Sequence, residues 1–193
     1  MRKIKIMEHI SLDGVIQHSN DDDDFPYSDW TAAYRTPIGR DAVLAAYGDN
    51  FDLLLGRRTY DIWSGFWPSM PSNPMGDRLN AATKYVATHN PESLVWGPFK
   101  GIGSDLVEDV RGIKSQDGPD LIVSGSSTLT TLLLEHGLAD EVLLIVSPVL
   151  LGTGKRLFAK GTPAHTFELI SSSAFASGVI FNAYKVIGPL KLK

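Results

Sequence analysis

The stretch that decides the fold is Leu121-Ile122-Val123-Ser124-Gly125-Ser126-Ser127-Thr128-Leu129. Its first three residues form a short continuous apolar run, which is typical of a strand covered on both faces. Ser126 and Ser127 are preferred N-cap residues, and leucines at 129, 132 and 133 recur at helical spacing. The stretch therefore predicts a buried strand, a small-residue turn and a helix, which is the repeating unit of a parallel α/β sheet.

A second stretch with the same order is Leu53-Leu54-Leu55-Gly56-Arg57-Arg58-Thr59-Tyr60. The apolar run 51–55 ends at Gly56, and a helix is predicted to begin at Arg57 and to continue to Trp63. Ligands of open α/β sheets bind across the carboxyl ends of the strands, so the two turns are expected to lie along one functional edge.

The rest of the chain extends this pattern. Apolar runs and helical spacing predict five further segments: strands at 4–10, 84–88 and 142–146, and helices at 42–47 and 106–110, the second helix stopping at Gly112. Two tail strands, 166–170 and 179–186, follow each other without a helix and are expected to pair antiparallel around 171–178. We therefore predict a single α/β domain over residues 1–193, with a central, mostly parallel β-sheet flanked by helices and an antiparallel C-terminal edge.

The amino-acid composition excludes several classes of protein. The 193 residues include 43% hydrophobic residues, 18 basic and 22 acidic side chains, and no cysteine. The lack of cysteine excludes a disulfide framework, a thiolate metal site, an iron–sulfur cluster and a cysteine nucleophile. The net charge of −4 argues against a general nucleic-acid binder, which is usually basic. No signal peptide and no run of roughly 18 apolar residues is present, so we expect a soluble, cytoplasmic protein with no nucleic acid and no membrane as partner.

Several motifs do not satisfy the chemistry that they suggest. Gly152-Thr153-Gly154-Lys155-Arg156 is not a P-loop, because Val149 and Arg156 stand where the first glycine and the final Ser or Thr are needed. Four adjacent aspartates such as Asp21–Asp24 are expected to direct their side chains away from one another and to form a solvated loop rather than a calcium or magnesium site. The five histidines form no HExxH motif, and no G-x-S-x-G motif surrounds the serines. Neither a metal site nor a serine hydrolase is expected.

The two strand-to-helix turns are the segments best suited to binding. Helix N-termini present unpaired backbone N–H groups and the positive end of the helix dipole, which together favour anions. Arg57, Arg58 and Thr59 add two guanidinium groups and a hydroxyl, while Gly125 allows close approach of the backbone. Each turn also has a simpler explanation, as a solvated arginine pair or an ordinary serine N-cap. Two such turns in one sheet predict a ligand with more than one phosphate group.

Two tryptophans, Trp63 and Trp67, lie close together just after the second turn. Packing in the core is one interpretation, and a wall for a planar substrate is the other.

The two turns, with the opening and closing strands, resemble the dihydrofolate-reductase-like superfamily. The closer match is the reductase half of the riboflavin-biosynthesis deaminase-reductase and its stand-alone relatives. Five stretches carry the resemblance, in the family's order over nearly the whole chain: Ile10-Ser11-Leu12-Asp13-Gly14-Val15-Ile16, Leu54-Leu55-Gly56-Arg57-Arg58-Thr59-Tyr60, Lys84-Tyr85-Val86, Val123-Ser124-Gly125-Ser126-Ser127-Thr128-Leu129, and Asp140-Glu141-Val142 through Pro148-Val149-Leu150-Leu151-Gly152-Thr153-Gly154.

This resemblance implies an NADPH-binding fold and, from the riboflavin branch, a homodimer. The cofactor-binding residues that it implies are Ile16 near the nicotinamide, Thr88 on the adenosine side, Gly56, Arg57, Arg58 and Thr59 at the 2′-phosphate and pyrophosphate, and Gly125, Ser126, Ser127 and Thr128 around the pyrophosphate.

The chain departs from the family at three points. Its second turn, Ser124-Gly125-Ser126, replaces two adjacent glycines and, in the riboflavin branch, a preceding acidic residue. The carboxylate that dihydrofolate reductases carry on the first helix corresponds in position to Arg40, and Asp41 is one residue away. The zinc deaminase half is absent, because its signature needs cysteines. Asp13 and Asp41 are the catalytic candidates for delivering a proton, with an ordered water as the alternative.

The resemblance and the two turns together predict an NADPH-dependent reductase of a small pterin-like or pyrimidine-like heterocycle, with hydride transfer from the nicotinamide. The alternative is a non-catalytic nucleotide-binding or interaction module with the same fold.

Overall fold

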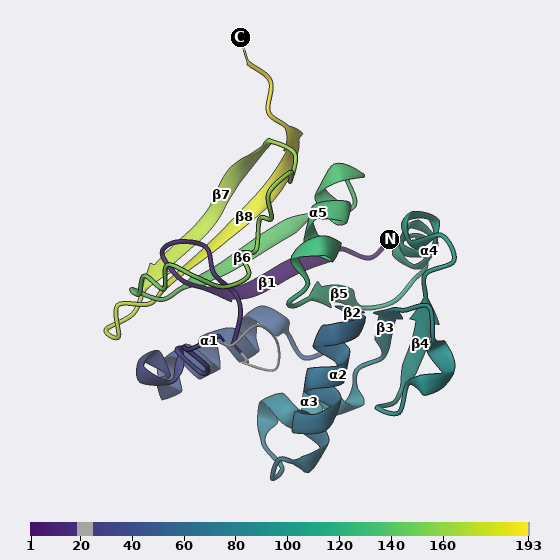
Figure 1. The fold of residues 1–193 in the computed structure, drawn as a ribbon, viewed down its shortest axis with the longest axis horizontal. Coiled ribbons are helices and arrows are strands. Elements are labelled where there is room, and N and C mark those ends of the chain that lie inside the picture. The colour runs from purple at the N-terminus through teal and green to yellow at the C-terminus, as the bar shows by residue number, and fades with distance from the viewer. Residues whose placement is uncertain (19–24, 193) are drawn as a thin grey trace.

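Eight strands form one sheet in the computed structural model, which describes residues 1–18 and 25–192. The strands are β1 (Ile4–Ile10), β2 (Phe51–Gly56), β3 (Lys84–Ala87), β4 (Phe99–Ile102), β5 (Asp120–Val123), β6 (Glu141–Val146), β7 (His165–Ala174) and β8 (Ile180–Pro189). Their order across the sheet is β4-β3-β2-β5-β1-β6-β8-β7 (Figure 1).

The first six strands run parallel to one another. β1 pairs with β5 and β6, β2 pairs with β5 and β3, and β3 pairs with β4, all in parallel register. β8 pairs antiparallel with β6, and β7 pairs antiparallel with β8 at the edge of the sheet. The predicted α/β class, with a mostly parallel sheet and an antiparallel C-terminal edge, is confirmed.

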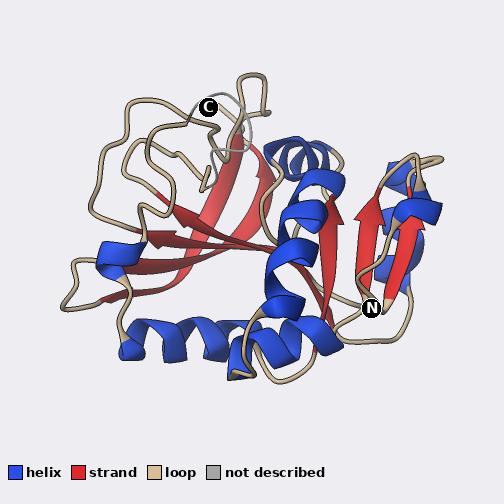
Figure 2. Cartoon of the chain, turned by 60° about the horizontal axis from the view of Figure 1, so that its bottom comes forward, coloured by secondary structure: helices blue, strands red, loops and turns tan. Residues whose placement is uncertain are grey.

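Helices cover both faces of the parallel part (Figure 2). They are α1 (Pro37–Tyr47), α2 (Arg57–Phe66), α3 (Pro74–Ala81), α4 (Leu106–Ser115) and α5 (Ser127–Glu135). α1, α2 and α3 contribute Tyr47, Tyr60 and Leu79 to one core cluster. α4 and α5 contribute Val110 and Leu133, among others, to the second cluster on the other face.

The helix that follows β5 therefore leaves the sheet on the face opposite to the helices that follow its neighbours β1 and β2. Such a reversal is a topological switch point, where open α/β sheets form a crevice beyond the carboxyl ends of their strands. The stretch that decides the fold, residues 121–129, stands at this point.

Four details differ from the sequence prediction. α1 begins at Pro37, five residues before the predicted start, because Thr36 caps it and proline suits the first turn of a helix. α4 continues through Gly112 to Ser115, because Ile113 is buried beyond the glycine and Gly112 itself faces open space. Residues 171–174 extend β7 instead of forming the turn, since they pair with β8 although their side chains are exposed. α3 and β4 were not predicted: β4 is almost fully exposed and has no apolar pattern, whereas the N-cap Asn73 followed by proline was a usable helix signal.

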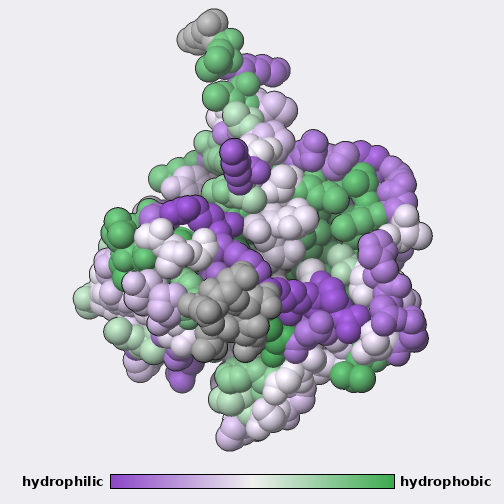
Figure 3. Space-filling model, viewed as in Figure 1, coloured by the Kyte–Doolittle hydropathy of each residue, from purple (hydrophilic) through white to green (hydrophobic). Residues whose placement is uncertain are grey.

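The C-terminal residues project beyond the sheet, with apolar and basic side chains alternating along them (Figures 1 and 3). Leu190 and Leu192 are 50% and 87% exposed.

Within residues 1–18 and 25–192, none of the helices has the length and apolar content needed to cross a membrane.

Candidate functional site

The two predicted turns contact each other at the carboxyl ends of β2 and β5. A Cβ atom added to Gly56 would lie 2.6 Å from Ser126 Oγ, and one added to Gly125 would overlap the Thr59 hydroxyl. Each turn thus fills the space that a side chain on the other would need, which explains why both carry a glycine. We call residues 56–59 and 124–128 the paired turns.

The backbone of the second turn is left-handed at two successive residues. Gly125 has φ 67° and Ser126 has φ 56°. The serine therefore keeps a conformation that glycine adopts freely, at a cost of roughly 1–2 kcal/mol for a residue with a Cβ. Its hydroxyl accepts a hydrogen bond from Leu129 N at 3.3 Å and caps α5, as predicted.

The N-terminus of α2 has no side-chain cap. Its N-cap is Gly56, so no hydroxyl or carboxylate from that position satisfies the first N–H groups of the helix. Those groups, together with the amino end of α5, create a positive potential on both sides of the β2–β5 boundary. The paired turns are therefore suited to an anion that spans both helix starts.

Arg57 is held in one orientation by its neighbours. Its Nε donates to Asp61 Oδ1 at 2.8 Å, and its Nη1 donates to Thr88 Oγ1 at 3.2 Å and to Ser93 Oγ at 2.7 Å. Its Nη2 makes no hydrogen bond within the described part of the chain. The structure thus brings Arg57 and Thr88 together. Arg58 follows on the exposed surface.

A pocket of about 510 Å³ adjoins the second turn at Ser127. Lys155, Arg156 and Lys160 also line it, so basic side chains gather beside the start of α5. Thr128 is exposed next to Ser127, and Ile16 is partly buried against the core, with its N–H donating to Lys155 O at 2.8 Å. The segment that follows β1 is thereby hydrogen-bonded to the loop that carries Lys155, Arg156 and Lys160.

Glu8 is a buried acidic residue that sequence reasoning missed. It is 5% exposed and its Oε1 accepts a hydrogen bond from the Gly125 N–H. Burial raises the pKa of its carboxyl well above the usual range. The signal was present: Ile4, Ile6 and Ile10 alternate on one face of β1, and an acidic residue at position 8 interrupts this apolar series.

Asp13 ties the turn after β1 to the loop after β6. Its carboxylate accepts from Ser11 Oγ at 2.7 Å, from Leu151 N at 3.1 Å and from Gly152 N at 2.9 Å, and it pairs with Arg156 at 3.4 Å. The Ser11 hydroxyl and these backbone N–H groups lower the pKa of Asp13 to about 2. A carboxylate held in its ionised form is suited to clamping two loops and poorly suited to donating a proton.

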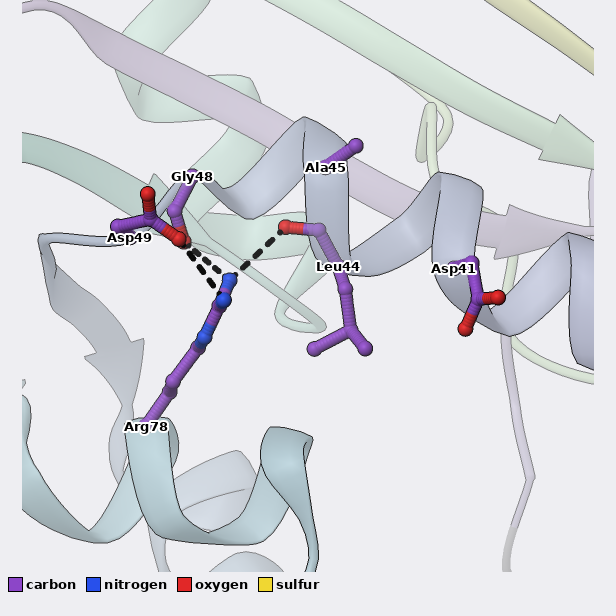
Figure 4. Close-up of a pocket in the computed structure, with 6 residues that line it drawn as sticks. All are labelled: Asp41, Leu44, Ala45, Gly48, Asp49 and Arg78. Atoms are coloured by element: carbon purple, nitrogen blue, oxygen red, sulfur yellow. Dashed lines mark hydrogen bonds and ion pairs between the residues drawn. The ribbon is translucent and has the colours of Figure 1, made fainter.

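Asp41 lies apart from the paired turns. It is exposed on α1, pairs with the neighbouring Arg40, and lines a shallow pocket of about 350 Å³ (Figure 4). The far end of that pocket is formed by Gly48 and Asp49, where Arg78 donates to Gly48 O at 2.8 Å and caps the carboxyl end of α1. α1 ends there just before β2 begins, so this end of the pocket is on the amino side of the sheet.

Trp63 and Trp67 pack against the core on the α1–α3 face. Both are partly buried, and their rings meet edge to face at 6.1 Å. At 1.5 Å per helical residue they lie about 9 and 15 Å along the axis from Arg57. This geometry fits the packing interpretation and gives no support for a wall beside the paired turns.

A cluster of three rings, those of His9, His18 and Trp30, lies beside the end of β1 and was not predicted from the sequence. The His18 ring stacks on Trp30 at 4.8 Å, and His9 meets His18 edge to face at 6.1 Å. Burial, with the Arg35 charge nearby, lowers the pKa of both histidines to about 4. Both are therefore neutral near pH 7.

The aspartate run Asp21–Asp24 lies outside the described residues. Within residues 1–18 and 25–192, no group of three or more histidine, aspartate or glutamate side chains is arranged to hold a metal ion.

Comparison with known proteins agrees with this architecture. The uncharacterized protein YyaP of Bacillus subtilis is 26% identical over 192 residues, covering 95% of this chain and 94% of that protein. A provisionally assigned riboflavin biosynthesis protein of Shewanella sp. PV-4 superimposes with a TM-score of 0.72 at 21% identity, over 95% of this chain and 98% of the other.

Two further structures share the fold. The diaminohydroxyphosphoribosylaminopyrimidine deaminase/5-amino-6-(5-phosphoribosylamino)uracil reductase of Thermotoga maritima aligns with a TM-score of 0.63 at 17% identity, over 96% of this chain and 56% of that one. Dihydrofolate reductase of Enterococcus faecalis, complexed with NADP(H), aligns with a TM-score of 0.61 at 15% identity, over 96% of both chains. The predicted dihydrofolate-reductase-like fold is confirmed.

The sequence model of the RibD C-terminal domain matches residues 2–181, nearly the whole chain. The chain therefore belongs to the RibD C-terminal domain family.

Proposed function

We propose that this protein is an NADPH-dependent reductase of a small pyrimidine-like or pterin-like heterocycle. The observation that carries the proposal is the contact between Gly56 and Ser126, which joins two helix N-termini into one anion-binding edge at the switch point. Two fold relatives support the chemistry, because one is named a uracil reductase and the other was solved with NADP(H).

The residues at the paired turns fit such a cofactor. The first N–H groups of α2 have no side-chain cap, so they can donate to the phosphates of a bound nucleotide. The residues that would hold the cofactor are Ile16, Gly56, Arg57, Arg58, Thr59, Thr88, Gly125, Ser126, Ser127 and Thr128. When bound, NADPH supplies a hydride from its nicotinamide ring, and the chain orients that ring toward the acceptor.

Arg57 is the residue that would select NADPH over NADH. Asp61, Thr88 and Ser93 fix its guanidinium, while Nη2 has no partner within the described residues and can meet the 2′-phosphate. A hydrogen bond to a charged group contributes about 1.5–3 kcal/mol, which corresponds to roughly 10- to 150-fold in affinity.

Protein fluorescence titrated with NADPH and with NADH tests the proposal. We expect wild type to bind NADPH more tightly, and R57A to lose about tenfold or more for NADPH with little change for NADH. R111A is the control, because Arg111 is exposed on α4 and pairs with Glu108 one turn earlier on the same helix. Failure of both nucleotides to bind wild type would refute the proposal, and an unchanged preference in R57A would refute the contact.

One observation favours a second candidate, a nucleotide-binding module without catalysis. Asp13 is held ionised by its hydrogen bonds, and Asp41 is exposed on α1 and pairs with Arg40, so neither is poised as a buried acid. A single-turnover assay separates the two candidates. NADPH oxidation that depends on dihydrofolate or a pyrimidine acceptor supports the reductase, and oxidation that no acceptor accelerates supports the module.

A further inference from the structure

The Glu8 carboxyl has only one of its two oxygens engaged. Oε1 accepts from the Gly125 N–H, whereas the second oxygen has no hydrogen-bond partner within the described residues. The residue is 5% exposed and stands on the same face of β1 as Ile4 and Ile6. This second oxygen is not among the fully buried unsatisfied atoms of the described residues, so it reaches the surface, where water or a ligand can bind it.

The surroundings of Glu8 supply no compensating ion pair from the part of the chain that the structure describes. None of the basic side chains in residues 1–18 and 25–192 forms an ion pair with it, and its register neighbour on β6 is the apolar Leu144. Removing an unpaired carboxylate from water is costly, and a carboxyl in such a site takes up a proton instead. The neutral acid then has an O–H group that needs an acceptor.

The position of Glu8 indicates where that acceptor comes from. The β1–β5 ladder ends at the pair Ile6–Val123. Beyond it, Ser124 Oγ donates to Met7 O at 3.1 Å and the Gly125 N–H donates to Glu8, so the Glu8 carboxyl lies against the second of the paired turns. A nucleotide bound along the carboxyl edge would bring oxygen acceptors to the same place.

We propose that Glu8 binds the nucleotide as a neutral acid, with Oε1 holding the Gly125 N–H and the protonated oxygen donating to an oxygen of the ligand. This inference rests on the proposed function. An ionised Glu8 has no proton to donate and repels phosphate, so the nucleotide binds the ionised form only after one proton is taken up from solvent. Nucleotide affinity therefore falls as the pH rises through the titration of Glu8.

The titratable side chains near Glu8 do not change their protonation state in the neutral pH range, so a pH dependence of nucleotide binding there would come from Glu8. Tyr47 on α1 interacts with it electrostatically, and burial and the Glu8 charge raise the pKa of that hydroxyl, which stays neutral. His9 is neutral above its pKa of about 4. The paired turns contribute the basic side chains Arg57 and Arg58 and otherwise only glycines and hydroxyl side chains.

Calorimetric titration with NADP⁺ across neutral and alkaline pH, on wild type and E8Q, tests this inference. Glutamine keeps an oxygen to accept from Gly125 and supplies an N–H donor at every pH. The wild-type Kd is expected to rise by up to tenfold per pH unit above the pKa of Glu8, whereas the E8Q Kd lacks that rise. The 2′-phosphate of NADP⁺ titrates in both experiments, so the ratio of the two Kd values isolates Glu8. E168Q, which removes an exposed carboxylate from β7, is expected to follow wild type.

The outcomes are distinguishable. If NADP⁺ binds and the ratio of Kd values is constant with pH, the inference is overturned and the proposed function stands. If NADP⁺ binds neither protein at any pH, the proposed function fails and the inference fails with it. Should E8Q not fold, wild type is titrated with NAD⁺, which lacks the 2′-phosphate, in two buffers of different ionisation enthalpy. Uptake approaching one proton per nucleotide above the pKa of Glu8 supports the inference, and zero uptake at every pH overturns it.

Discussion

Replacing Gly56 with alanine is the sharpest test of how the paired turns fit together. Gly56 has φ −68° and ψ 151°, which alanine adopts without strain. Any cost must therefore come from contact, because the new methyl group would lie 2.6 Å from Ser126 Oγ and 2.8 Å from Ser126 Cβ. Ordinary contact begins near 3.4 Å, so one of the two turns has to move by several tenths of an ångström.

Ser126 cannot move freely. Its left-handed backbone is fixed by the turn and its hydroxyl caps α5 through Leu129 N. Overpacking of this kind costs about 1–3 kcal/mol, and a lost cap adds up to about 1 kcal/mol. The smaller unfolded-state entropy of alanine returns about 0.4–1 kcal/mol. We expect G56A to lower the free energy of unfolding by about 2 kcal/mol, measured by urea denaturation.

The decisive comparison is the same change in an S126G background. Glycine at 126 removes both atoms that the methyl group would meet, so G56A should become neutral or slightly stabilising there. S126G alone should change stability by less than about 1 kcal/mol, because relief of left-handed strain offsets the weaker cap and the larger unfolded-state entropy. G65A, at an α2 glycine with open space around it, is the control and should not destabilise. An equal cost of G56A in both backgrounds would refute the contact argument.

Three further expectations follow from other contacts. D13N should lower the free energy of unfolding by about 2 kcal/mol in urea denaturation, because an amide cannot accept hydrogen bonds from Leu151, Gly152 and Ser11 together. A decrease of less than about 0.5 kcal/mol would contradict the role of Asp13 in joining the two loops. His9 and His18 are neutral in the folded state down to about pH 4 but protonate near pH 6.5 in the unfolded state. The free energy of unfolding should therefore fall by about 1.4 kcal/mol per pH unit for each histidine as the pH drops from 6.5 toward 4. A free energy of unfolding that does not change with pH in that window would contradict this expectation. We also propose that the protein is a homodimer. The grounds are the family resemblance and the exposed apolar side chains along the β7–β8 hairpin, such as Leu169, which is 56% exposed. A monomer mass in light scattering at micromolar protein would contradict this proposal.

The sequence predicted the parallel core well, for a physical reason. β2 and β5 contain the fully buried runs Leu53–Leu55 and Leu121–Val123. β6 contains the apolar run Val142–Val146, whose buried residues contact both core clusters. Short apolar runs of this kind can be recognised in a single sequence. β4 could not be found in this way, since an exposed edge strand needs no apolar residues. Its Gly101 leaves no room for a side chain beside Pro91, and this contact between distant residues has no local sequence pattern.

The site was predicted in part. Periodicity located the two strand-to-helix turns, but their mutual contact depends on the order of β2 and β5 in the sheet, which no local pattern encodes. The same limit applies to Glu8, whose partner Gly125 is 117 residues away. The Asp13 clamp escaped notice for the same reason, because it acts through Leu151 and Gly152 in a distant loop.

The interlocking of Gly56 with Ser126 also constrains how the protein can change. A side chain larger than hydrogen at 56 becomes acceptable only after the residue at 126 has shrunk, so one order of substitutions is open and the reverse order passes through a destabilised intermediate. Laboratory evolution that mutates one position at a time would change this edge of the sheet only by the order in which position 126 mutates first. Libraries that vary positions 56 and 126 together would reach new binding edges on the same fold.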